Sequence, residues 1–517
     1  MLRAVIAGLV LIVASPASAL ADPCAGTGFY AGVARYADGT HAEVTVNLMC
    51  DGGQFKAQFF TPAGDFDSSV AAVAGDHFTA TLDTGSALGQ VDLKRTGDQL
   101  AGAFDVGGDK GTLTLTRRGD ALAADAMAPR LDLTPAQWRE DVRALAVGLP
   151  KLHANAFFSL SRAEFDAEVA VLDRRAASAN GDEMWVGLQQ IAKSIGDGHT
   201  GVNAPADREI MPIEVTRFGD DIRITAVGPG LGAALGARIV KIGGMPINKV
   251  WARVLTLTAR EELAPLREGD ALIYLTRGYA LHGLDVTPIR NRALYTVRGE
   301  SGRLFDVDVA ALAKGATAAM ISDAAQKPLR FEEPQSAFWC KALPADSALY
   351  CGWRAYEDLP AKARAMFATV DSARPAKLII DMRDNGGGDN TVGYAALIKP
   401  IEARADLNVR GRLYILVGPL TFSAAMNNAA QFQDQTKAIL AGQTIGERPN
   451  SYQEPRQFRL PNSHLVVRAS TLWYAFRKTG PNVVAPEKEI VPTWDDVRNG
   501  RDPVLDWVLA QPARPRA

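Results

Sequence analysis

LIIDMRDNGGG, residues 378–388, begins with a short apolar run that ends in turn residues. Such a run is typical of a strand that is buried on both faces of a covered parallel sheet. The successive glycines at its end tolerate positive φ angles, so that bare backbone N–H groups can face a ligand. The stretch therefore predicts an α/β fold with a ligand-facing loop at one strand end.

A second apolar run, Leu413–Val417, leads into a tight turn that contains Ser423, and Ala424–Phe432 has helix-forming composition. This places the Ser423 hydroxyl at a helix N-terminus, where unpaired amides and the macrodipole favour a developing negative charge. Serine is also a preferred N-cap residue, which is the structural alternative. If the two strands are neighbours, three amides can form an oxyanion hole for acyl transfer, namely those of Gly387, Gly388 and Ala424.

Three segments together resemble the signatures of a known family: DMRDNGGG (Asp381–Gly388), TFSAA (Thr421–Ala425) and GDGHT (Gly196–Thr200). They are similar to segments of the serine peptidase family of C-terminal-processing (tail-specific) and tricorn proteases, in the same order along the chain. The resemblance implies a crotonase-like (ClpP-like) α/β catalytic domain, preceded by a helical segment and a PDZ-like module. It also implies a hydrolase, either a serine-type endopeptidase or a carboxy-terminal-processing peptidase.

The resemblance also bears on the general base. The tail-specific branch activates its serine with a lysine, and Arg448 stands at that position here. Arginine stays protonated and cannot accept the serine proton. The tricorn-like branch uses a histidine from the segment that His199 matches, so His199 is predicted as the general base of Ser423. Asp197 could orient this imidazole, although its position favours a turn-forming role.

The acidic partner of His199 is less clear from the sequence. The tricorn-like branch has a glutamate that is expected near Gly480–Asn482, and none of those residues is acidic. The substitutes are Glu447, Glu487 and Glu489. Glu447 ranks first because its loop is expected to lie close to the nucleophile, and a salt bridge with a neighbouring cation is the alternative role.

The predicted reaction is peptide-bond hydrolysis through an acyl-enzyme, and it needs no metal and no organic cofactor. The expected partner is a peptide or protein substrate. Two alternatives stay open. The first is a non-catalytic protein on the same fold that binds peptides or hydrophobic ligands, as the interphotoreceptor retinoid-binding proteins do. The second is an esterase that acts on small acyl substrates.

Composition narrows the class of protein. The chain has 517 residues, of which 47% are hydrophobic and 22% charged, enough for about three domains of ~150 residues each. The formal net charge of −2 gives no electrostatic reason to expect nucleic acid or an anionic membrane as a partner.

The N-terminus predicts export. Arg3 precedes the apolar run Ala4–Val13, and the small residues Ala17–Ala19 follow, as in a secretory signal peptide. The run is too short to span a bilayer, and no later apolar stretch is long enough. We therefore expect a periplasmic or secreted protein without an integral membrane segment once the signal is removed.

Export also accounts for the cysteines. Four cysteines allow three pairings, and their local grouping favours Cys24–Cys50 and Cys340–Cys351 as structural disulfides. None has the spacing of a zinc site.

We predict five segments along the chain from its short period-two runs, its helical periodicity and the motifs above. The segments are a signal peptide (1–21), an antiparallel β domain of unknown role (22–120), a helical segment with the His199 motif (130–204), a PDZ-like β-rich module (205–315) and the crotonase-like catalytic domain (330–517).

Overall fold

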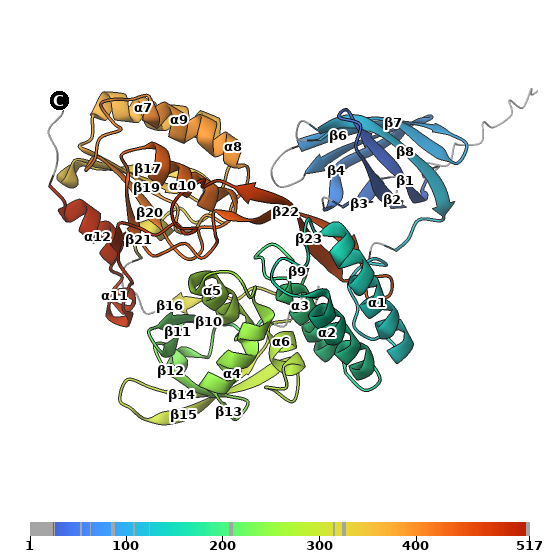
Figure 1. The fold of residues 1–517 in the computed structure, drawn as a ribbon, viewed down its shortest axis with the longest axis horizontal. Coiled ribbons are helices and arrows are strands. Elements are labelled where there is room, and N and C mark those ends of the chain that lie inside the picture. Colours follow the sequence, from blue (N-terminus) through green and yellow to red (C-terminus); the bar gives the residue numbers. More distant parts are fainter. Residues whose placement is uncertain are drawn as a thin grey trace, which may run out of the picture. The chain divides into compact units, whose positions relative to one another are not determined.

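The computed structural model describes residues 24, 26–51, 54–62, 64–83, 88–106, 109–123, 125–205, 210–313, 316–322 and 327–512 (Figure 1). The predicted signal peptide, residues 1–21, lies outside the described residues. The chain folds into two compact units that divide between Ala126 and Met127. None of the helices within the described ranges combines the length and the apolar character that a membrane crossing requires.

The N-terminal unit is a closed barrel of antiparallel strands, in which β8 pairs with both β7 and β1. Its strands are β1 (Gly28–Tyr36), β2 (His41–Asp51), β3 (Gln54–Phe60), β4 (Asp65–Ala74), β5 (His77–Asp83), β6 (Leu88–Thr96), β7 (Gln99–Val106) and β8 (Asp109–Gly119). Alternating apolar side chains such as Val46, Leu48 and Leu93 fill the interior. The Cys24–Cys50 disulfide ties the start of the described chain to β2.

Three helices open the second unit: α1 (Pro135–Leu152), α2 (Arg162–Arg175) and α3 (Gly181–Ser194). Each begins with a capping box, whose N-cap residues are Thr134, Ser161 and Asn180. In a capping box the N-cap and N3 side chains satisfy two otherwise unpaired amides. Helix α3 is buried along most of its length and leads directly into the loop that carries His199.

The β-rich module contains a sheet with the strand order β10-β11-β12-β14-β15, extended by two short strands. Its strands are β10 (Ile213–Phe218), β11 (Asp221–Val227), β12 (Arg238–Ile242), β13 (Met245–Pro246), β14 (Arg292–Arg298), β15 (Leu304–Ala310) and β16 (Ile321–Ser322). The sequence predicted a β-rich module in this region, and three helices interrupt its strands: α4 (Ile247–Val254), α5 (Ala264–Tyr274) and α6 (Gly278–Gly283).

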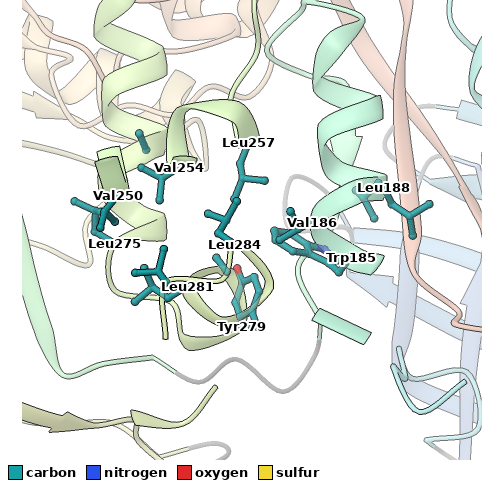
Figure 2. Packing of buried hydrophobic residues seen from close by; sticks show 14 of the residues in the cluster. Trp185, Val186, Leu188, Val250, Val254, Leu257, Leu275, Tyr279, Leu281 and Leu284 are labelled. Atoms are coloured by element: carbon teal, nitrogen blue, oxygen red, sulfur yellow. The ribbon is translucent and has the colours of Figure 1, made fainter. Parts of the chain in front are cut away.

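Tertiary packing explains these helices. Val250 and Val254 of α4 and Leu281 of α6 lie in the same hydrophobic core as Trp185 and Leu188 of α3 (Figure 2). A short helix gains most of its stability from packing its apolar face into such a core rather than from intrinsic helix propensity. Helix α3 and the β-rich module therefore form one packed body.

The C-terminal region is built on a sheet with the order β17-β18-β19-β20-β21-β24, parallel from β18 onward. Its strands are β17 (Phe338–Leu343), β18 (Ala348–Trp353), β19 (Lys377–Asp381), β20 (Leu413–Val417), β21 (Ile439–Gly442) and β24 (Lys488–Glu489). Leu378 and Ile380 face one hydrophobic core and Ile379 faces another. The predicted strand is therefore buried on both faces, and β19 and β20 are neighbours.

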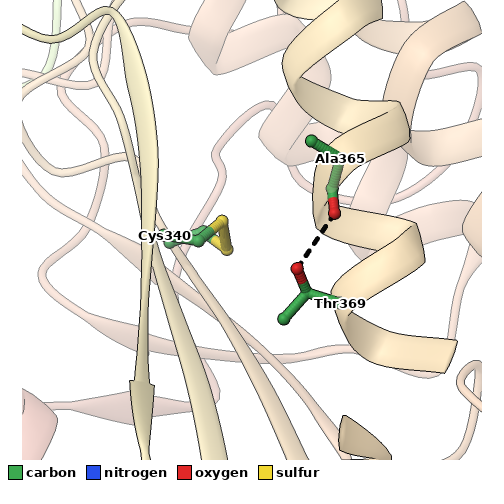
Figure 3. Close-up of a disulfide and its surroundings, with 4 residues drawn as sticks. Cys340, Ala365 and Thr369 are labelled. Atoms are coloured by element: carbon green, nitrogen blue, oxygen red, sulfur yellow. Dashed lines mark hydrogen bonds between the residues drawn. A yellow bond between two sulfur atoms is a disulfide. The ribbon is translucent and has the colours of Figure 1, made fainter. Parts of the chain in front are cut away.

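Helices cover both faces of this sheet (Figure 1). They are α7 (Leu359–Ala373), α8 (Asn390–Gly393), a π-helical turn (Tyr394–Ile398), α9 (Lys399–Glu402), α10 (Ala424–Gln435) and α12 (Pro503–Ala510). Helix α11 (Trp494–Arg498) instead contacts the β-rich module, where the ring of Trp494 lies against that of Phe218. The Cys340–Cys351 disulfide joins β17 to β18 beside α7, where the Thr369 hydroxyl donates to the Ala365 carbonyl over 3.0 Å (Figure 3).

A long hairpin leaves this region and joins the helical segment. Strands β22 (Asn450–Arg459) and β23 (Val466–Ala475) form a sheet with β9 (Gly201–Val202), the strand that directly follows the His199 loop. Leu465 and Val467 belong to the same buried core as α1 and α3. The hairpin thus fastens the His199 loop to the region that carries Ser423.

A buried ionic network anchors the loop after β19. The Arg383 guanidinium donates to Asp381 over 2.9 Å and to Asp502 over 2.8 Å. The Tyr350 hydroxyl also donates to Asp381, over 2.8 Å. The three charged side chains are at most 6% exposed. The network therefore holds the exit of β19 against α12 in a fixed geometry.

Replacing Arg383 by Leu is expected to lower the free energy of unfolding by about 3–5 kcal/mol, because it leaves two buried carboxylates without their counter-charge. Urea denaturation followed by tryptophan fluorescence measures the change. The matched control is Arg498→Leu, whose ion pairs with Glu300 and Asp495 lie at the surface and whose loss should cost less than about 1 kcal/mol. Equal losses in the two variants would contradict this account.

Candidate active site

Ser423 lies at the N-terminus of α10 in an unusual backbone conformation, with φ 55° and ψ −125°. Such a conformation costs about 1–3 kcal/mol and persists only where the surrounding structure enforces it. The side chain makes no capping hydrogen bond, so the N-cap alternative is not realised. Its Oγ instead lies 3.1 Å from Nε2 of His199.

The loops at the carboxyl ends of β19 and β20 enforce this turn. The Phe422 amide donates to the Asn385 carbonyl over 3.0 Å, and the Thr421 hydroxyl donates to the Met382 carbonyl over 2.8 Å. Gly387 packs directly against the turn at φ 113°, and a Cβ there would come within 2.8 Å of Cβ of Ser423. Only glycine permits this close approach.

Two of the three predicted oxyanion donors are available. The Gly387 amide donates to Oδ1 of Asn385 over 3.0 Å and is therefore engaged. The amides of Gly388 and Ala424 have no hydrogen-bond partner within the described part of the chain. The Ala424 amide is also the first of α10, where the helix dipole favours negative charge.

The His199 imidazole is enclosed beside Ser423. Its ring stacks on Phe422 with centroids 4.6 Å apart, and its side chain is 7% exposed. Burial lowers the pKa of His199 to about 4, with the cations Arg468 and Lys193 adding to the effect and Asp197 opposing it. The ring is therefore neutral at neutral pH, the form that can accept a proton.

Glu447 lies on the other side of the imidazole. Its Oε1 is 3.5 Å from Nδ1 of His199, and neither atom has a hydrogen-bond partner among the described residues. Its Oε2 accepts the Ser423 amide. The side chain is fully buried, and burial together with the Glu262 carboxylate raises its pKa well above the usual range. Ser423, His199 and Glu447 thus form a contiguous series.

The other candidate acids lie elsewhere. Glu487 pairs with Arg410 at the surface, and Glu489 is exposed in β24. The alternative of a salt bridge beside Glu447 is not realised with Arg448, whose Nε donates to the Glu261 carbonyl over 2.9 Å.

Asp197 forms the turn that the sequence predicted. Its Oδ1 accepts the amides of His199 over 3.0 Å and Thr200 over 2.8 Å. Its Oδ2 lies 3.0 Å from Nε2 of His153, and Ser470 donates to Oδ1 over 2.6 Å. Burial disfavours the carboxylate, but the hydrogen bonds from His153, Ser470 and Thr200 outweigh it and hold the pKa of Asp197 at about 2. Asp197 is thus a fixed anion behind the His199 loop.

Glu262 is a site residue that sequence reasoning missed. Its Oε1 accepts the Gly198 amide over 3.0 Å, while its buried Oε2 has no hydrogen-bond partner in the described ranges. Burial raises the pKa of Glu262 to about 7. It comes from the connection between α4 and α5, where no motif signalled a functional residue. His153 was also missed, because it is the C-cap residue of α1 and belongs to none of the motifs in the sequence.

The assembled groups suit acyl transfer better than metal binding. A hydroxyl and a neutral imidazole lie within hydrogen-bond reach of each other, and a buried carboxyl group lies at the opposite nitrogen of the imidazole. In the parts of the chain that the structure describes, no group of three or more His, Cys, Asp or Glu could hold a metal ion.

Comparison with known proteins places this fold. No protein-family model matches the chain, and no curated protein matches it. The solved structure of mature CPAF complexed with lactacystin is similar with a TM-score of 0.53 and 13% identity, covering 72% of this chain and 98% of that one. A CPAF mutant gives a TM-score of 0.52 at 12% identity, covering 74% and 99%. The photosystem II D1 C-terminal processing protease gives 0.34 at 14% identity, covering 69% and 92%. The fold of this chain is therefore that of the CPAF-type proteases, in agreement with its resemblance to the C-terminal-processing and tricorn serine peptidases.

Proposed function

We propose that this protein is an exported serine peptidase that hydrolyses peptide bonds through an acyl-enzyme. One observation carries the proposal: Nε2 of His199 and Oγ of Ser423 lie 3.1 Å apart although 224 positions separate them in sequence. An alcohol in hydrogen-bond reach of a neutral imidazole, beside unpaired amides, is the arrangement that nucleophilic catalysis requires.

In the proposed mechanism, Ser423 attacks the substrate carbonyl while its proton passes to Nε2 of His199. The amides of Gly388 and Ala424 stabilise the oxyanion, and the dipole of α10 adds to this effect. Glu447, when ionised, accepts a hydrogen bond from the Nδ1–H group of the imidazolium and stabilises its positive charge. His199 then protonates the leaving amine, and a water molecule releases the acyl group by the reverse steps.

The wider architecture supports this proposal. We assign the sheet β17-β18-β19-β20-β21-β24 and its helices to a crotonase-like catalytic domain. We assign residues 205–315 to a PDZ-like module. The segment pattern Arg3–Ala21 and two disulfides, Cys24–Cys50 and Cys340–Cys351, support export to an oxidising compartment.

Labelling by a fluorophosphonate tests the nucleophile. The wild-type protein is expected to gain one phosphonyl group, which mass spectrometry maps to the peptide that contains Ser423. The Ser423→Ala variant should remain unlabelled, since among the described residues the serine hydroxyl bonded to the His199 imidazole is that of Ser423. The control is Ser372→Ala, an exposed residue of α7, which should label as the wild type does. Full labelling of Ser423→Ala would reject the assignment.

A substrate panel separates the peptidase from the two alternatives. Peptides with internal and C-terminal scissile bonds should be cleaved, and short acyl esters should serve as weaker substrates. Cleavage of esters alone would indicate an esterase. Ligand binding without any turnover or labelling would indicate a non-catalytic binding protein.

A further inference from the structure

A cavity of about 520 Å³ lies between the helical segment and the first helices of the β-rich module. Its wall comes from α2, α3, α4 and α5 and from the chain between α4 and α5. All of these share one hydrophobic core, and Figure 2 shows the part of it that includes α3 and α4. This volume falls within the range of sites for small molecules. Neither Ser423, His199 nor Glu447 lines it, so the cavity is distinct from the candidate active site.

The lining combines cationic and apolar side chains. The wall contains one carboxylate, that of Glu168, and four cationic side chains, those of Arg175, Lys193, Arg260 and Arg267. Val171 and Leu255 are among the apolar residues of the wall, and Val171 is 49% exposed. A site of this composition favours a ligand that carries both a negative charge and an apolar part.

Lys193 is the buried cation of the cavity, with 8% exposure. Its ammonium donates to the Gly198 carbonyl over 3.1 Å, and no second acceptor or ion pair is recorded for it in the described ranges. A lysine has three donors, so two remain for a ligand. Asp270 acts on Lys193 only at longer range, and Arg260 already has an ion pair with Glu168, at 3.4 Å. A buried ammonium with one neutral partner is stabilised by an added anion.

The cavity is connected to the loop that carries His199. Besides the bond from Lys193 to Gly198, the Arg260 amide donates to the Lys193 carbonyl over 3.4 Å, and the Glu261 amide donates to the Gly196 carbonyl over 3.1 Å. A ligand that moves Lys193 or this connecting segment therefore changes the hydrogen bonds at the start of the His199 loop.

We infer that this cavity binds a small amphipathic carboxylate and that its occupancy alters the surroundings of His199. The carboxylate lies against Lys193 and the arginines, and the apolar part lies along Val171 and Leu255. This site does not depend on the proposed peptidase function. An acylated amino acid and a medium-chain fatty acid share the required chemistry.

Isothermal titration calorimetry on the full chain with Ser423→Ala tests the inference without turnover. The probes are N-acetyl-leucine and octanoate, each against its uncharged carboxamide. Each acid that binds should do so at least about tenfold more tightly than its amide, because a hydrogen bond to a charged group is stronger than one to a neutral group. Tighter binding of N-acetyl-leucine assigns the site to peptide-like ligands, and tighter binding of octanoate assigns it to lipid-derived ones. Equal affinities of acid and amide overturn the inference.

Three variants locate the binding site. Arg267→Gln removes a cation of the wall, and Ala252→Trp fills the cavity from an exposed position of α4. Each should weaken binding of the acid by about tenfold or more. Arg174→Gln, exposed on α2 and outside the lining, is the matched control and should bind as the parent does. Binding that neither Arg267→Gln nor Ala252→Trp affects places the ligand elsewhere and overturns the inference.

The link to His199 has its own readout. Saturation with the acid should shift the imidazole resonances of His199 in a histidine-labelled protein, and the amide should not shift them at the same concentration. Binding without such a shift refutes the link. A failure of phosphonate labelling with binding intact rejects the peptidase proposal alone, so the two proposals fail separately.

Discussion

Replacing Ser423 by Ala or His199 by Gln is expected to lower kcat/KM for a peptide substrate by roughly 10⁴- to 10⁶-fold. The first change removes the nucleophile. The second removes the neutral imidazole whose Nε2 lies 3.1 Å from Oγ of Ser423, although glutamine retains a polar side chain of similar length. The residual rate should come from binding and from the oxyanion donors, which both variants keep.

The double variant makes this prediction sharper. Because the two residues act in one step, Ser423→Ala with His199→Gln should be no slower than the slower single variant, whereas independent contributions would multiply. Steady-state kinetics on one fluorogenic peptide measures all three. His77→Gln, an exposed histidine of the barrel, is the control and should keep wild-type activity. Substantial turnover by His199→Gln would refute the assigned base.

Local sequence patterns predicted the elements that carry the nucleophile. β19 and β20 are short apolar runs bounded by turn residues, and the helix after Ser423 has a helix-forming composition, so neighbouring residues alone determine them. The loop of three glycines after β19 could also be predicted from the sequence, because the positive φ angles at Gly387 and Gly388 require glycine.

The rest of the site depends on contacts between distant segments. Glu262 lies in the connection between α4 and α5, outside both helices, and reaches the site through its contact with the Gly198 amide, which no local pattern signals. The hairpin β22–β23 crosses from the C-terminal region to β9, a pairing that no local pattern encodes.

Where the resemblance led us to expect a glutamate, near Gly480–Asn482, the structure has an asparagine with a structural role. The Asn482 side chain accepts the Asn450 amide over 2.7 Å and donates to the Asn450 carbonyl over 2.9 Å, so it holds the start of β22. The acid beside His199 comes instead from Glu447, in the loop before that strand. Glu447 ranked first among the candidate acids in the sequence, but no sequence pattern could reveal Glu262, the second carboxyl group, which raises the pKa of Glu447.

Glu447→Gln is expected to lower kcat/KM by roughly 10⁴-fold, because an amide cannot stabilise the imidazolium as a carboxylate does. The wild-type pH profile should reflect the same group. His199 is already neutral above a pKa of about 4, so its titration does not limit activity near neutral pH. The ionisation of Glu447 limits activity instead, because its pKa is raised. The carboxyl group is protonated at low pH and ionises as the pH rises, so kcat/KM should increase toward alkaline pH.

Glu262→Gln should move this acid limb toward lower pH. Besides burial, the negative charges of Glu262 and Asp197 raise the pKa of Glu447, and glutamine at position 262 removes one of these charges while keeping an acceptor for the Gly198 amide. Glu262 itself ionises only around pH 7, so at about pH 6 the variant and the wild type should be equally active. Above about pH 7 the variant should be several-fold more active, until Glu447 is ionised in both proteins and the two rates become equal again. Glu261→Gln, exposed and adjacent, is the matched control and should leave the profile unchanged. A profile of Glu262→Gln that is unshifted, or shifted to higher pH, would remove Glu447 as the group whose ionisation governs the rate.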